Sequence, residues 1–246
     1  MKAVVLGGAH GIGRAVARTL VERGDQVFLL GIGADDLARS ASDLTQRGGA
    51  KQPVAYAECN LEDTSQFEAA LEAADRALSG FDTLVITAAL FGTQDKLEAD
   101  LDFARRLLVV NFAHTVIFAE HARRRLLARG GGTLCVISSV AGDRGRKPVV
   151  LYGASKAGIS AYLEGLDHKF HDQGLRVITI KPGFVKTGMT AGLKPPPFAG
   201  EPEQVARDIV RALDRGTPVV YTPRMWQLVM LVIRNLPRFV MRKLGF

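Results

Sequence analysis

The sequence predicts an α/β fold: one doubly wound domain with a seven-stranded parallel sheet and helices on both faces. Seven short runs are rich in Val, Ile and Leu and lack polar alternation, which is typical of parallel strands buried on both faces. The runs are residues 3–6, 26–30, 54–58, 83–86, 133–138, 176–180 and 218–221. Longer stretches with helical patterning alternate with them, and this alternation favours βαβ units with right-handed crossovers.

Six stretches are predicted to be helices, namely residues 11–23, 34–47, 63–79, 97–129, 150–173 and 202–215. No Pro-, Gly- or Ser-rich linker divides the chain. We therefore expect residues 1–222 to form one domain and residues 223–246 a basic, apolar helical tail. Residues 188–200 include Pro195-Pro196-Pro197 and are expected to form an irregular loop. Long loops in compact domains are often binding loops, so this is the predicted substrate loop.

Composition and charge exclude several classes of protein. Of 246 residues, 47% are hydrophobic and 23% charged, which excludes a disordered chain. The two cysteines, Cys59 and Cys135, are expected to be buried thiols. The net charge of +7 is uneven, because residues 215–246 carry six cations and no acid, which leaves +1 for the rest. A near-neutral body argues against nucleic acid as a partner. No signal peptide is recognised at the N-terminus, which predicts a cytoplasmic protein.

A glycine turn follows the first predicted strand and leads into the first predicted helix. It reads Gly7-Gly8-Ala9-His10-Gly11-Ile12-Gly13. Glycine permits positive φ and lets the backbone approach a pyrophosphate closely. The N-terminus of the following helix offers free N–H groups and a positive dipole end to that anion. This position in the chain is the one that a Rossmann dinucleotide-binding site requires.

A Ser, a Tyr and a Lys form the candidate reaction centre. Tyr152 and Lys156 are four residues apart on a predicted helix, so they share one face. A phenol has an ordinary pKa of about 10, and we expect the neighbouring ammonium to lower it. The pair then suits a general acid or base at a carbonyl oxygen. Ser139 follows the C-terminal end of the fifth predicted strand, where ligands of such sheets bind, and is expected to hydrogen-bond the same oxygen.

Together these residues resemble the short-chain dehydrogenase/reductase family over essentially the whole chain. The resemblance implies that Ser139, Tyr152 and Lys156 are catalytic and that Asn111 holds a helix kink and a proton-relay water. It implies NAD(H) or NADP(H) as the cofactor, with Lys156 also binding the nicotinamide ribose. The run Pro182-Gly183-Phe184-Val185-Lys186-Thr187 is similar to the family's P-G-x-V-x-T run beside the nicotinamide, which places Thr187 toward its carboxamide.

The same resemblance implies a set of cofactor-binding residues: Gly7, His10, Gly11, Ile12, Gly13, Asn60, Leu61, Ala88, Tyr152, Lys156, Pro182, Gly183, Val185 and Thr187. The chain departs from the family by having Leu6 where Thr is frequent, and Ile86-Thr87-Ala88-Ala89 in place of N-N-A-G. Leu30 is not the Asp of NAD-specific members, and Ile32 is not the Arg of many NADP-specific ones. The coenzyme preference stays open, and either His10 or Arg14 is a candidate cation for a 2′-phosphate. The histidines show no metal-ligand pattern.

Two basic segments bear on the substrate. Residues 142–147 contain Arg144, Arg146 and Lys147 between Ser139 and Tyr152, which favours an anionic substrate such as a phosphate, with a solvated loop as the alternative. Residues 225–233 are nearly all apolar but fall short of the roughly 20 residues that span a bilayer. Cations follow at every fourth residue. This pattern suits docking on an anionic membrane face, and the alternative is packing on the protein or on a second copy.

Residues 142–146, together with residues 234–238 and 242–244, are similar to the decaprenylphosphoryl-2-keto-erythro-pentose reductases. This resemblance implies a 2-keto sugar on a polyprenyl phosphate as substrate, a role in cell-wall arabinan, a flavin oxidase as functional partner and a peripheral place on the inner membrane. The wider family implies a homodimer or homotetramer. Two alternatives stay open: a carbonyl or 3-oxoacyl reductase of a soluble or lipid substrate, and a non-catalytic dinucleotide-binding sensor.

Overall fold

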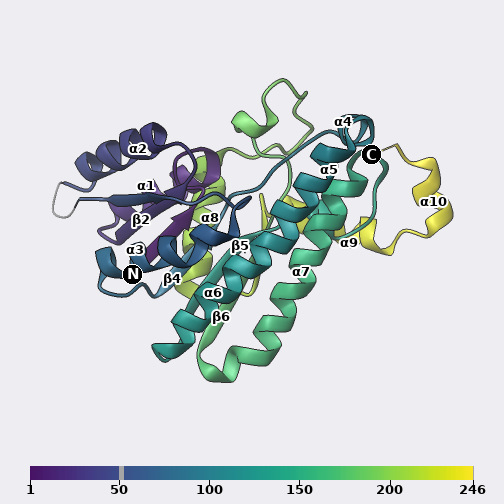
Figure 1. The fold of residues 1–246 in the computed structure, drawn as a ribbon. Helices are drawn as coiled ribbons and strands as arrows, with labels where there is room; N and C mark the ends of the chain where they lie inside the picture. The colour runs from purple at the N-terminus through teal and green to yellow at the C-terminus, as the bar shows by residue number, and fades with distance from the viewer. Residues whose placement is uncertain (50–52, 246) are drawn as a thin grey trace.

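Seven parallel strands form one sheet in the order β3-β2-β1-β4-β5-β6-β7 (Figure 1). The computed structural model describes residues 1–49 and 53–245 of the chain. The strands are β1 (Lys2–Leu6), β2 (Gln26–Gly31), β3 (Ala55–Glu58), β4 (Thr83–Ile86), β5 (Gly132–Ile137), β6 (Leu175–Pro182) and β7 (Val219–Thr222). The strand order reverses between β1 and β4. In open α/β sheets, ligands bind outside the carboxyl ends of the strands at this switch point.

Helices cover both faces of the sheet, which confirms the doubly wound prediction. On one face, α1 (Gly11–Glu22), α2 (Ala34–Arg47) and α8 (Pro202–Arg215) pack on alternate strand residues such as Val5 and Leu29. On the other, α3 (Phe67–Leu78), α6 (Thr115–Ala128) and α7 (Val150–Phe170) pack on the residues between them, such as Val4 and Leu6. Single 3₁₀ turns occur at Thr64–Gln66, Val140–Gly142, Lys147–Val149 and His171–Gln173. Cys59 and Cys135 are buried, as expected.

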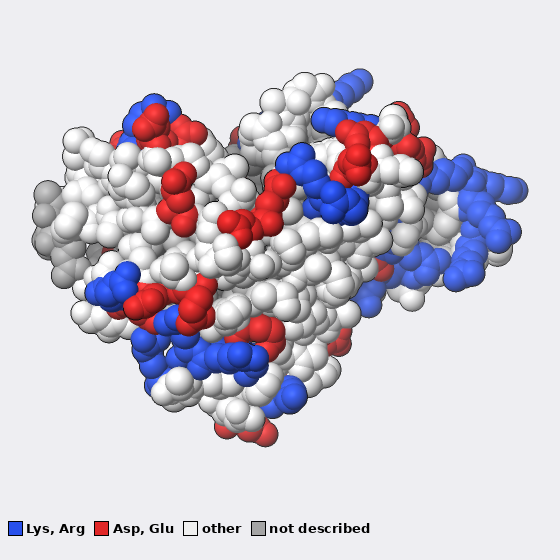
Figure 2. All heavy atoms as spheres, in the orientation of Figure 1, with Lys and Arg blue, Asp and Glu red and all other residues white. Residues whose placement is uncertain are grey.

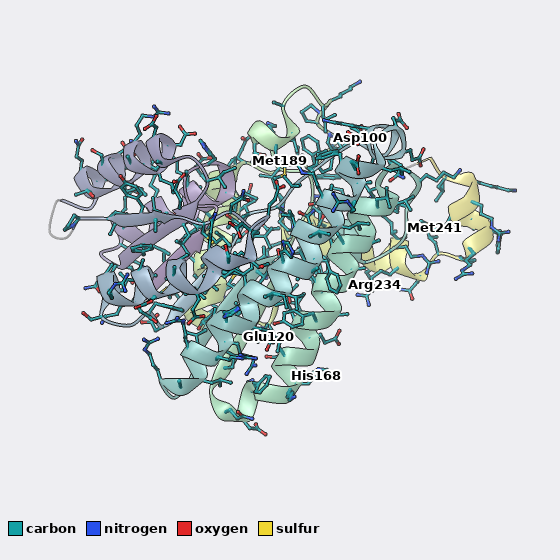
Figure 3. All side chains as sticks on the ribbon, viewed as in Figure 1. Asp100, Glu120, His168, Met189, Arg234 and Met241 are labelled. Carbon is teal, nitrogen blue, oxygen red and sulfur yellow. The ribbon has the colours of Figure 1, made fainter. Side chains whose placement is uncertain are left out.

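The single helix expected over residues 97–129 is wrong. The chain instead forms α4 (Gln94–Ala99), α5 (Leu101–Leu108), a π-helical turn (Val109–His114) and α6. The first break occurs because Asp100 caps α5: its Oδ1 accepts a hydrogen bond from the Phe103 N–H at 2.9 Å. Figure 3 labels Asp100 at this break. The π-helical turn contains Asn111, and such turns occur frequently at functional sites.

The predicted substrate loop and the tail lie at the same end of the sheet. Residues 188–200 contain one 3₁₀ turn, Gly188–Thr190, and are otherwise irregular, with Val185 and Gly200 joined by a β-bridge. Beyond β7 the tail forms α9 (Met225–Asn235) and α10 (Arg238–Lys243), with Pro237 immediately before α10. Figure 1 shows α10 extending past the end of α7. Within the described residues, no helix is both long and apolar enough to span a bilayer.

Candidate active site

A cavity of about 1120 Å³ opens at the carboxyl ends of the strands, at the β1–β4 switch point. Apart from Asn111, every catalytic or cofactor-binding residue that the family resemblance implies lines it: Gly7, His10, Gly11, Ile12, Gly13, Asn60, Leu61, Ala88, Ser139, Tyr152, Lys156, Pro182, Gly183, Val185 and Thr187. These residues come from widely separated parts of the chain. The fold therefore brings the glycine turn, the Ser-Tyr-Lys set and the P-G-x-V-x-T run to one cavity.

The glycine turn has the geometry that a pyrophosphate needs. Gly7 and Gly11 have φ values of +89° and +51°, which residues with a Cβ rarely adopt. A Cβ on Gly13 would overlap the carbonyl oxygen of Gly7 and Oγ1 of Thr87. Helix α1 begins at Gly11 with no side-chain cap and no acidic residue in its first turn, so its N–H groups and dipole are available to an anion. These features fit a dinucleotide cofactor.

Thr87 holds the strand that carries the glycine turn. Its hydroxyl donates to the carbonyl oxygen of Leu6 at 2.9 Å, from the position where the family usually has Asn. The departure noted in the sequence at Ile86-Thr87-Ala88-Ala89 thus retains a side-chain bond between β4 and the end of β1. The turn is supported although the family residue is missing.

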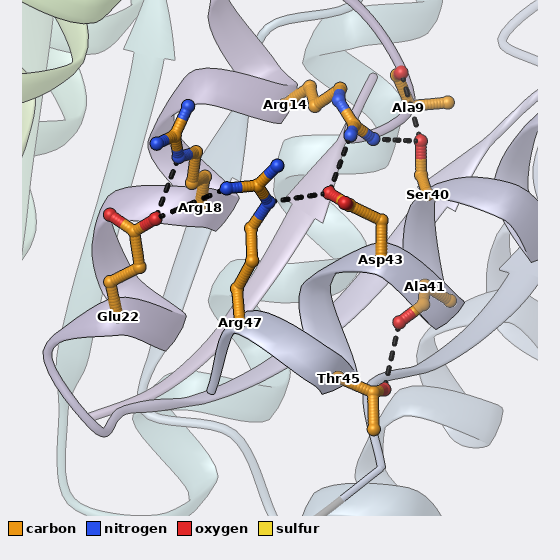
Figure 4. A network of polar contacts seen from close by, with 9 residues as sticks. All are labelled: Ala9, Arg14, Arg18, Glu22, Ser40, Ala41, Asp43, Thr45 and Arg47. Atoms are coloured by element: carbon orange, nitrogen blue, oxygen red, sulfur yellow. Dashed lines mark hydrogen bonds and ion pairs between the residues drawn. The ribbon is translucent and has the colours of Figure 1, made fainter. Parts of the chain in front are cut away.

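The two cations named for a 2′-phosphate differ in placement. His10 lines the cavity, and its Nε2 lies 3.0 Å from Oδ2 of Asp36. The expectation for Arg14 is wrong, because its guanidinium binds Ser40 at 2.8 Å and Asp43 at 2.7 Å on α2 (Figure 4). Arg14 is absent from the cavity wall. Arg14 lies one helical turn after His10, on the side of α1 that faces α2.

Ser139, Tyr152 and Lys156 meet on one side of the cavity. The Lys156 ammonium is buried, lies 5.7 Å from the centroid of the Tyr152 ring and donates to the carbonyl oxygen of Ile137 at 2.9 Å. Ser139 Oγ accepts from the Ala141 N–H at 3.1 Å. Tyr152 packs edge-on against Phe91, with ring centroids 5.1 Å apart. These contacts fix all three side chains.

The expected direction of the tyrosine pKa is wrong. Burial raises the pKa of Tyr152 to about 12, and a hydrogen bond to Ser139 opposes this only in part. Burial also lowers the pKa of Lys156 to about 8. Removal from water disfavours the charged form of each group, so the desolvation of both exceeds the attraction expected between them. The tyrosine is a neutral phenol at neutral pH.

Asn111 lies outside the cavity wall and is 1% exposed. Its side-chain amide makes two hydrogen bonds with the backbone of Leu90. Oδ1 accepts from the Leu90 N–H at 2.7 Å, and Nδ2 donates to the Leu90 carbonyl oxygen at 2.8 Å. Leu90 itself lines the cavity. Asn111 therefore ties the π-helical turn to the segment after β4.

The structure adds residues to the cavity that sequence reasoning missed. Trp226, Val229 and Ile233 of α9 form part of its wall. Phe198, from the predicted substrate loop, and Arg146, one of the loop cations named from the sequence, line it as well. The indole N–H of Trp226 donates to the Phe198 carbonyl at 3.3 Å. The apolar positions of α9, spaced three and four apart, are the signal for a buried face. The pattern alone does not say that the face closes a ligand cavity.

The loop before Tyr152 is anchored to the tail and the sheet. Asp143 accepts from Lys181 Nζ at 2.6 Å and from the Tyr221 hydroxyl at 2.7 Å. The Arg144 guanidinium donates to the carbonyl oxygen of Leu236 at 2.9 Å. The two segments that carry the closer sequence resemblance therefore contact each other.

Known proteins resemble this chain over most of its length. A model of the short chain dehydrogenase family matches residues 1–197. An uncharacterized oxidoreductase of Mycobacterium tuberculosis is 32% identical over 241 residues, 98% of this chain and 96% of that protein. The cis-4-hydroxycyclohexanecarboxylate dehydrogenase of Sinomonas cyclohexanicum is 31% identical over 194 residues, 78% of this chain and 76% of that protein.

Solved structures share the fold. A variant of actinorhodin polyketide ketoreductase with NADPH has a TM-score of 0.80 at 21% identity, covering 89% of this chain and 94% of that one. Levodione reductase has the same TM-score and identity, covering 89% of this chain and 95% of that one. The chain belongs to the short-chain dehydrogenase/reductase family. It is an NAD(P)-dependent oxidoreductase.

Proposed function

We propose that this protein reduces a keto group with NADH or NADPH, using Tyr152 as the proton donor. The observation that carries the proposal is one shared cavity. Ser139, Tyr152 and Lys156 line it, and so does the glycine turn. Residues Gly7 to Gly13 would hold the pyrophosphate. Asn60, Leu61 and Ala88 would hold the adenosine, and Pro182, Gly183, Val185 and Thr187 the nicotinamide. The bound cofactor supplies the hydride to the carbonyl carbon.

Tyr152 transfers the proton to the carbonyl oxygen, which yields the alcohol. Because burial raises its pKa, Tyr152 is protonated at neutral pH and is in the donating form, but it is a weaker acid than an ordinary phenol, so the proton transfer depends on stabilisation of the phenolate. The Ser139 hydroxyl positions the carbonyl oxygen. The Lys156 ammonium, fixed by Ile137, stabilises the phenolate that forms and returns a proton to it. Asn111 acts through the backbone of Leu90 to hold the relay in place.

A carbonyl panel assayed with each coenzyme tests this proposal. Oxidation of NADH and NADPH is followed at 340 nm with cyclic ketones, 3-oxoacyl esters and keto sugars, for the wild type and for Tyr152→Phe. We expect turnover of at least one class with one preferred coenzyme, and loss of that turnover in the variant. A protein that binds the coenzyme but reduces no carbonyl would instead support the dinucleotide-binding sensor.

We further propose that the substrate is lipid-linked and that the tail docks on an anionic membrane. Helix α9 has two faces: Trp226, Met230 and Ile233 pack inward, whereas Leu228, Leu231 and Val232 are 61–62% exposed. Five exposed cations of the tail accompany this apolar face: Arg224, Arg234, Arg238, Arg242 and Lys243. Figure 2 shows Lys and Arg gathered at the projecting end of the molecule. Figure 3 labels Arg234 and Met241 there.

Exposed apolar side chains flanked by cations and no acid are the chemistry that an anionic lipid surface accepts. Since the inner face of α9 lines the cavity, docking would place the cavity next to the bilayer. Docking there is compatible with the substrate that the sequence resemblance implies, a polyprenyl-phosphate-linked 2-keto sugar, and with a flavin oxidase that makes it as functional partner. It also supports a cytoplasmic protein at the inner membrane face, with a role in cell-wall synthesis.

Vesicle flotation tests the docking with point variants, because deletion of the tail would open the cavity. Phosphatidylglycerol vesicles are compared with phosphatidylcholine vesicles. The triple variant Arg234→Gln/Arg238→Gln/Arg242→Gln should lose binding on the order of 100-fold at low salt, at roughly 1 kcal/mol per cation. Arg76→Gln/Arg105→Gln/Arg211→Gln removes three exposed cations elsewhere and should retain binding. Equal binding of both triple variants would reject docking by the tail.

A soluble keto substrate is the second candidate. It is favoured by the relative named for cis-4-hydroxycyclohexanecarboxylate, a small ring alcohol. Rapid reduction of 4-oxocyclohexanecarboxylate by a wild type that ignores anionic vesicles would select it over the lipid-linked substrate.

We also propose that the protein assembles as a homodimer or homotetramer through the helices that follow β4 and the start of α7. Apolar side chains stand exposed there: Leu101 at 73%, Phe112 at 41%, Ile117 at 45% and Val150 at 52%. Burial of such side chains is what stabilises obligate interfaces. Light scattering on protein eluted from a size-exclusion column tests this. Ile117→Glu should shift the measured molar mass toward that of the monomer.

A further inference from the structure

One residue of the cavity wall carries a buried polar atom that lacks a partner among the described residues. Arg146 lines the cavity together with Ser139 and Tyr152. Its Nε is buried, and within residues 1–49 and 53–245 it has no hydrogen-bond partner. A buried donor left unpaired destabilises the fold, and more so when the group is charged. No described residue offers this guanidinium a hydrogen-bond acceptor at Nε, and the side chain lines the cavity, so its other N–H groups are available to an acceptor there.

The nearby carboxylate does not neutralise Arg146. Asp143 raises the pKa of Arg146, yet burial outweighs it and lowers the pKa overall. Both oxygens of Asp143 are engaged, one with Lys181 at 2.6 Å and the other with Tyr221 at 2.7 Å. An arginine stays protonated in proteins because its ordinary pKa is so high. Arg146 is thus a desolvated cation on the cavity wall.

The other cations of the same loop are used differently. Arg144 donates to the Leu236 carbonyl at 2.9 Å and so holds the tail. Lys147 is exposed to solvent and takes no part in the cavity wall. Of the three cations that the sequence places between Ser139 and Tyr152, Arg146 is the one that faces the ligand space.

We propose that Arg146 binds an oxyanion of the keto substrate, a carboxylate or a phosphate, and so selects anionic keto compounds. A guanidinium suits either group, because its planar fork matches the oxygens of both. The cavity wall elsewhere carries large apolar side chains, among them Phe184, Phe198, Trp226 and Val229. The substrate accordingly combines an anionic group with an apolar body. This inference rests on the proposed keto reduction.

Matched substrate pairs test the inference. 4-Oxocyclohexanecarboxylate is compared with its methyl ester, and dihydroxyacetone phosphate with dihydroxyacetone, so that each pair differs in one anionic group. Arg146→Met should lower kcat/KM for the preferred charged compound at least tenfold and change that for its neutral partner less than twofold. Arg146→Lys should recover part of the loss. Lys147→Met removes a cation of the same loop outside the cavity and should leave both members unchanged.

Binding is measured beside turnover. Trp226 is the single tryptophan of the chain and lines the cavity, so its fluorescence reports occupancy by each charged compound with coenzyme present. The wild type should bind the charged member of at least one pair more tightly than its neutral partner, and Arg146→Met should lose this difference. The pair that responds distinguishes carboxylate from phosphate.

The outcomes separate this inference from the proposed function. Equal loss on charged and neutral members would mean that Arg146 only supports the fold, and would overturn the inference. Weaker coenzyme binding in Arg146→Met with unchanged substrate KM would assign the residue to the coenzyme and overturn it as well. Turnover of neutral ketones with no preference for anionic ones would support keto reduction and overturn the role of Arg146 in selecting anions. Charge-selective binding dependent on Arg146, with no reduction of any carbonyl, would overturn the reduction and retain the anion site.

Discussion

Lys156 donates from Nζ to the carbonyl oxygen of Ile137 at 2.9 Å and is almost fully buried. The ammonium thus reaches back from α7 to the end of β5, just before Ser138-Ser139. This hydrogen bond, together with the one from Ser138 Oγ to the Lys156 carbonyl at 2.9 Å, connects the strand that presents Ser139 to the helix that presents Tyr152. The positions of the three groups are therefore mutually dependent.

The buried ammonium predicts a pH dependence of stability. The pKa of Lys156 is lowered to about 8, against about 10.4 when unfolded. Between these two pKa values Lys156 is protonated in the unfolded chain and largely deprotonated in the folded one. The free energy of unfolding therefore rises with pH over this range, by about 3 kcal/mol from this group. Urea unfolding at pH 7 to 10 should show the rise in the wild type and its loss in Lys156→Met. Lys169→Met, an exposed lysine of the same helix, should keep it.

Tyr152 predicts the opposite trend at higher pH. Its pKa is raised to about 12, so above pH 10 the folded chain keeps a proton that the unfolded chain loses. The free energy of unfolding should therefore fall as the pH rises from 10 to 12. In Tyr152→Phe this contribution should be absent. An identical pH profile for wild type and variant would show that Tyr152 is not desolvated.

Asn111 is predicted to stabilise the fold through Leu90. Asn111→Leu leaves both backbone groups of Leu90 without their partner, so we expect a loss of about 2–3 kcal/mol in the free energy of unfolding. Asn111→Asp keeps an acceptor for the Leu90 N–H but buries a carboxylate oxygen against the Leu90 carbonyl, so it should not recover the loss at neutral pH. Urea unfolding measures both. Wild-type stability in Asn111→Leu would refute this role.

The ion pair between Asp143 and Lys181 is predicted to contribute far more than exposed pairs. Its side chains are 3% and 14% exposed, so Asp143→Ala leaves a buried cation unpaired and should cost about 3–5 kcal/mol. Lys186 and Glu201 form the matched exposed pair, with side chains 49% and 53% exposed. Lys186→Met should cost less than about 1 kcal/mol. Similar losses from both substitutions would contradict the difference in burial.

Gly13 tests whether the glycine turn binds the coenzyme. Gly13→Ala places a Cβ against the Gly7 carbonyl oxygen and Thr87, and we expect coenzyme affinity to fall roughly 10- to 100-fold, because overpacking costs about 1–3 kcal/mol. Energy transfer from Trp226 to NADH or NADPH measures the affinity. Gly165→Ala, in α7, meets no atom within 4 Å and should leave binding unchanged. Unchanged affinity in Gly13→Ala would place the pyrophosphate elsewhere.

Local patterns predicted most of the fold and of the site. The strands, the glycine turn and the Tyr152–Lys156 spacing each depend on residues close together in the chain, so periodicity and motif context identify them. Features that depend on distant packing were missed or wrong. Asp100 breaks a helix that looks continuous, because capping competes with helical patterning. The sequence names Arg144, Arg146 and Lys147 together, and only the packing of the loop, in which Asp143 is engaged by Lys181 and Tyr221 from β6 and β7, shows that Arg146 is the one that lines the cavity.

The pKa of Tyr152 shows the same limit. The spacing to Lys156 is visible in the sequence, and it suggests that the ammonium lowers the pKa. The depth of burial is set by the whole cavity wall, including α9, and it reverses the direction. Proximity in the sequence therefore identified Tyr152 and Lys156 as partners. It did not show that desolvation of the phenol would outweigh the attraction of the ammonium in setting the pKa.

The most direct test of keto reduction by Tyr152 is the single-turnover rate of NAD(P)H oxidation in Tyr152→Phe, measured by stopped flow with the best carbonyl from the panel. We expect the rate to fall by about 10² to 10⁴, the usual contribution of a general acid. Coenzyme affinity, read from Trp226, should change less than twofold. A variant that oxidises the coenzyme at the wild-type rate would contradict the account, because the proton would then come from another group.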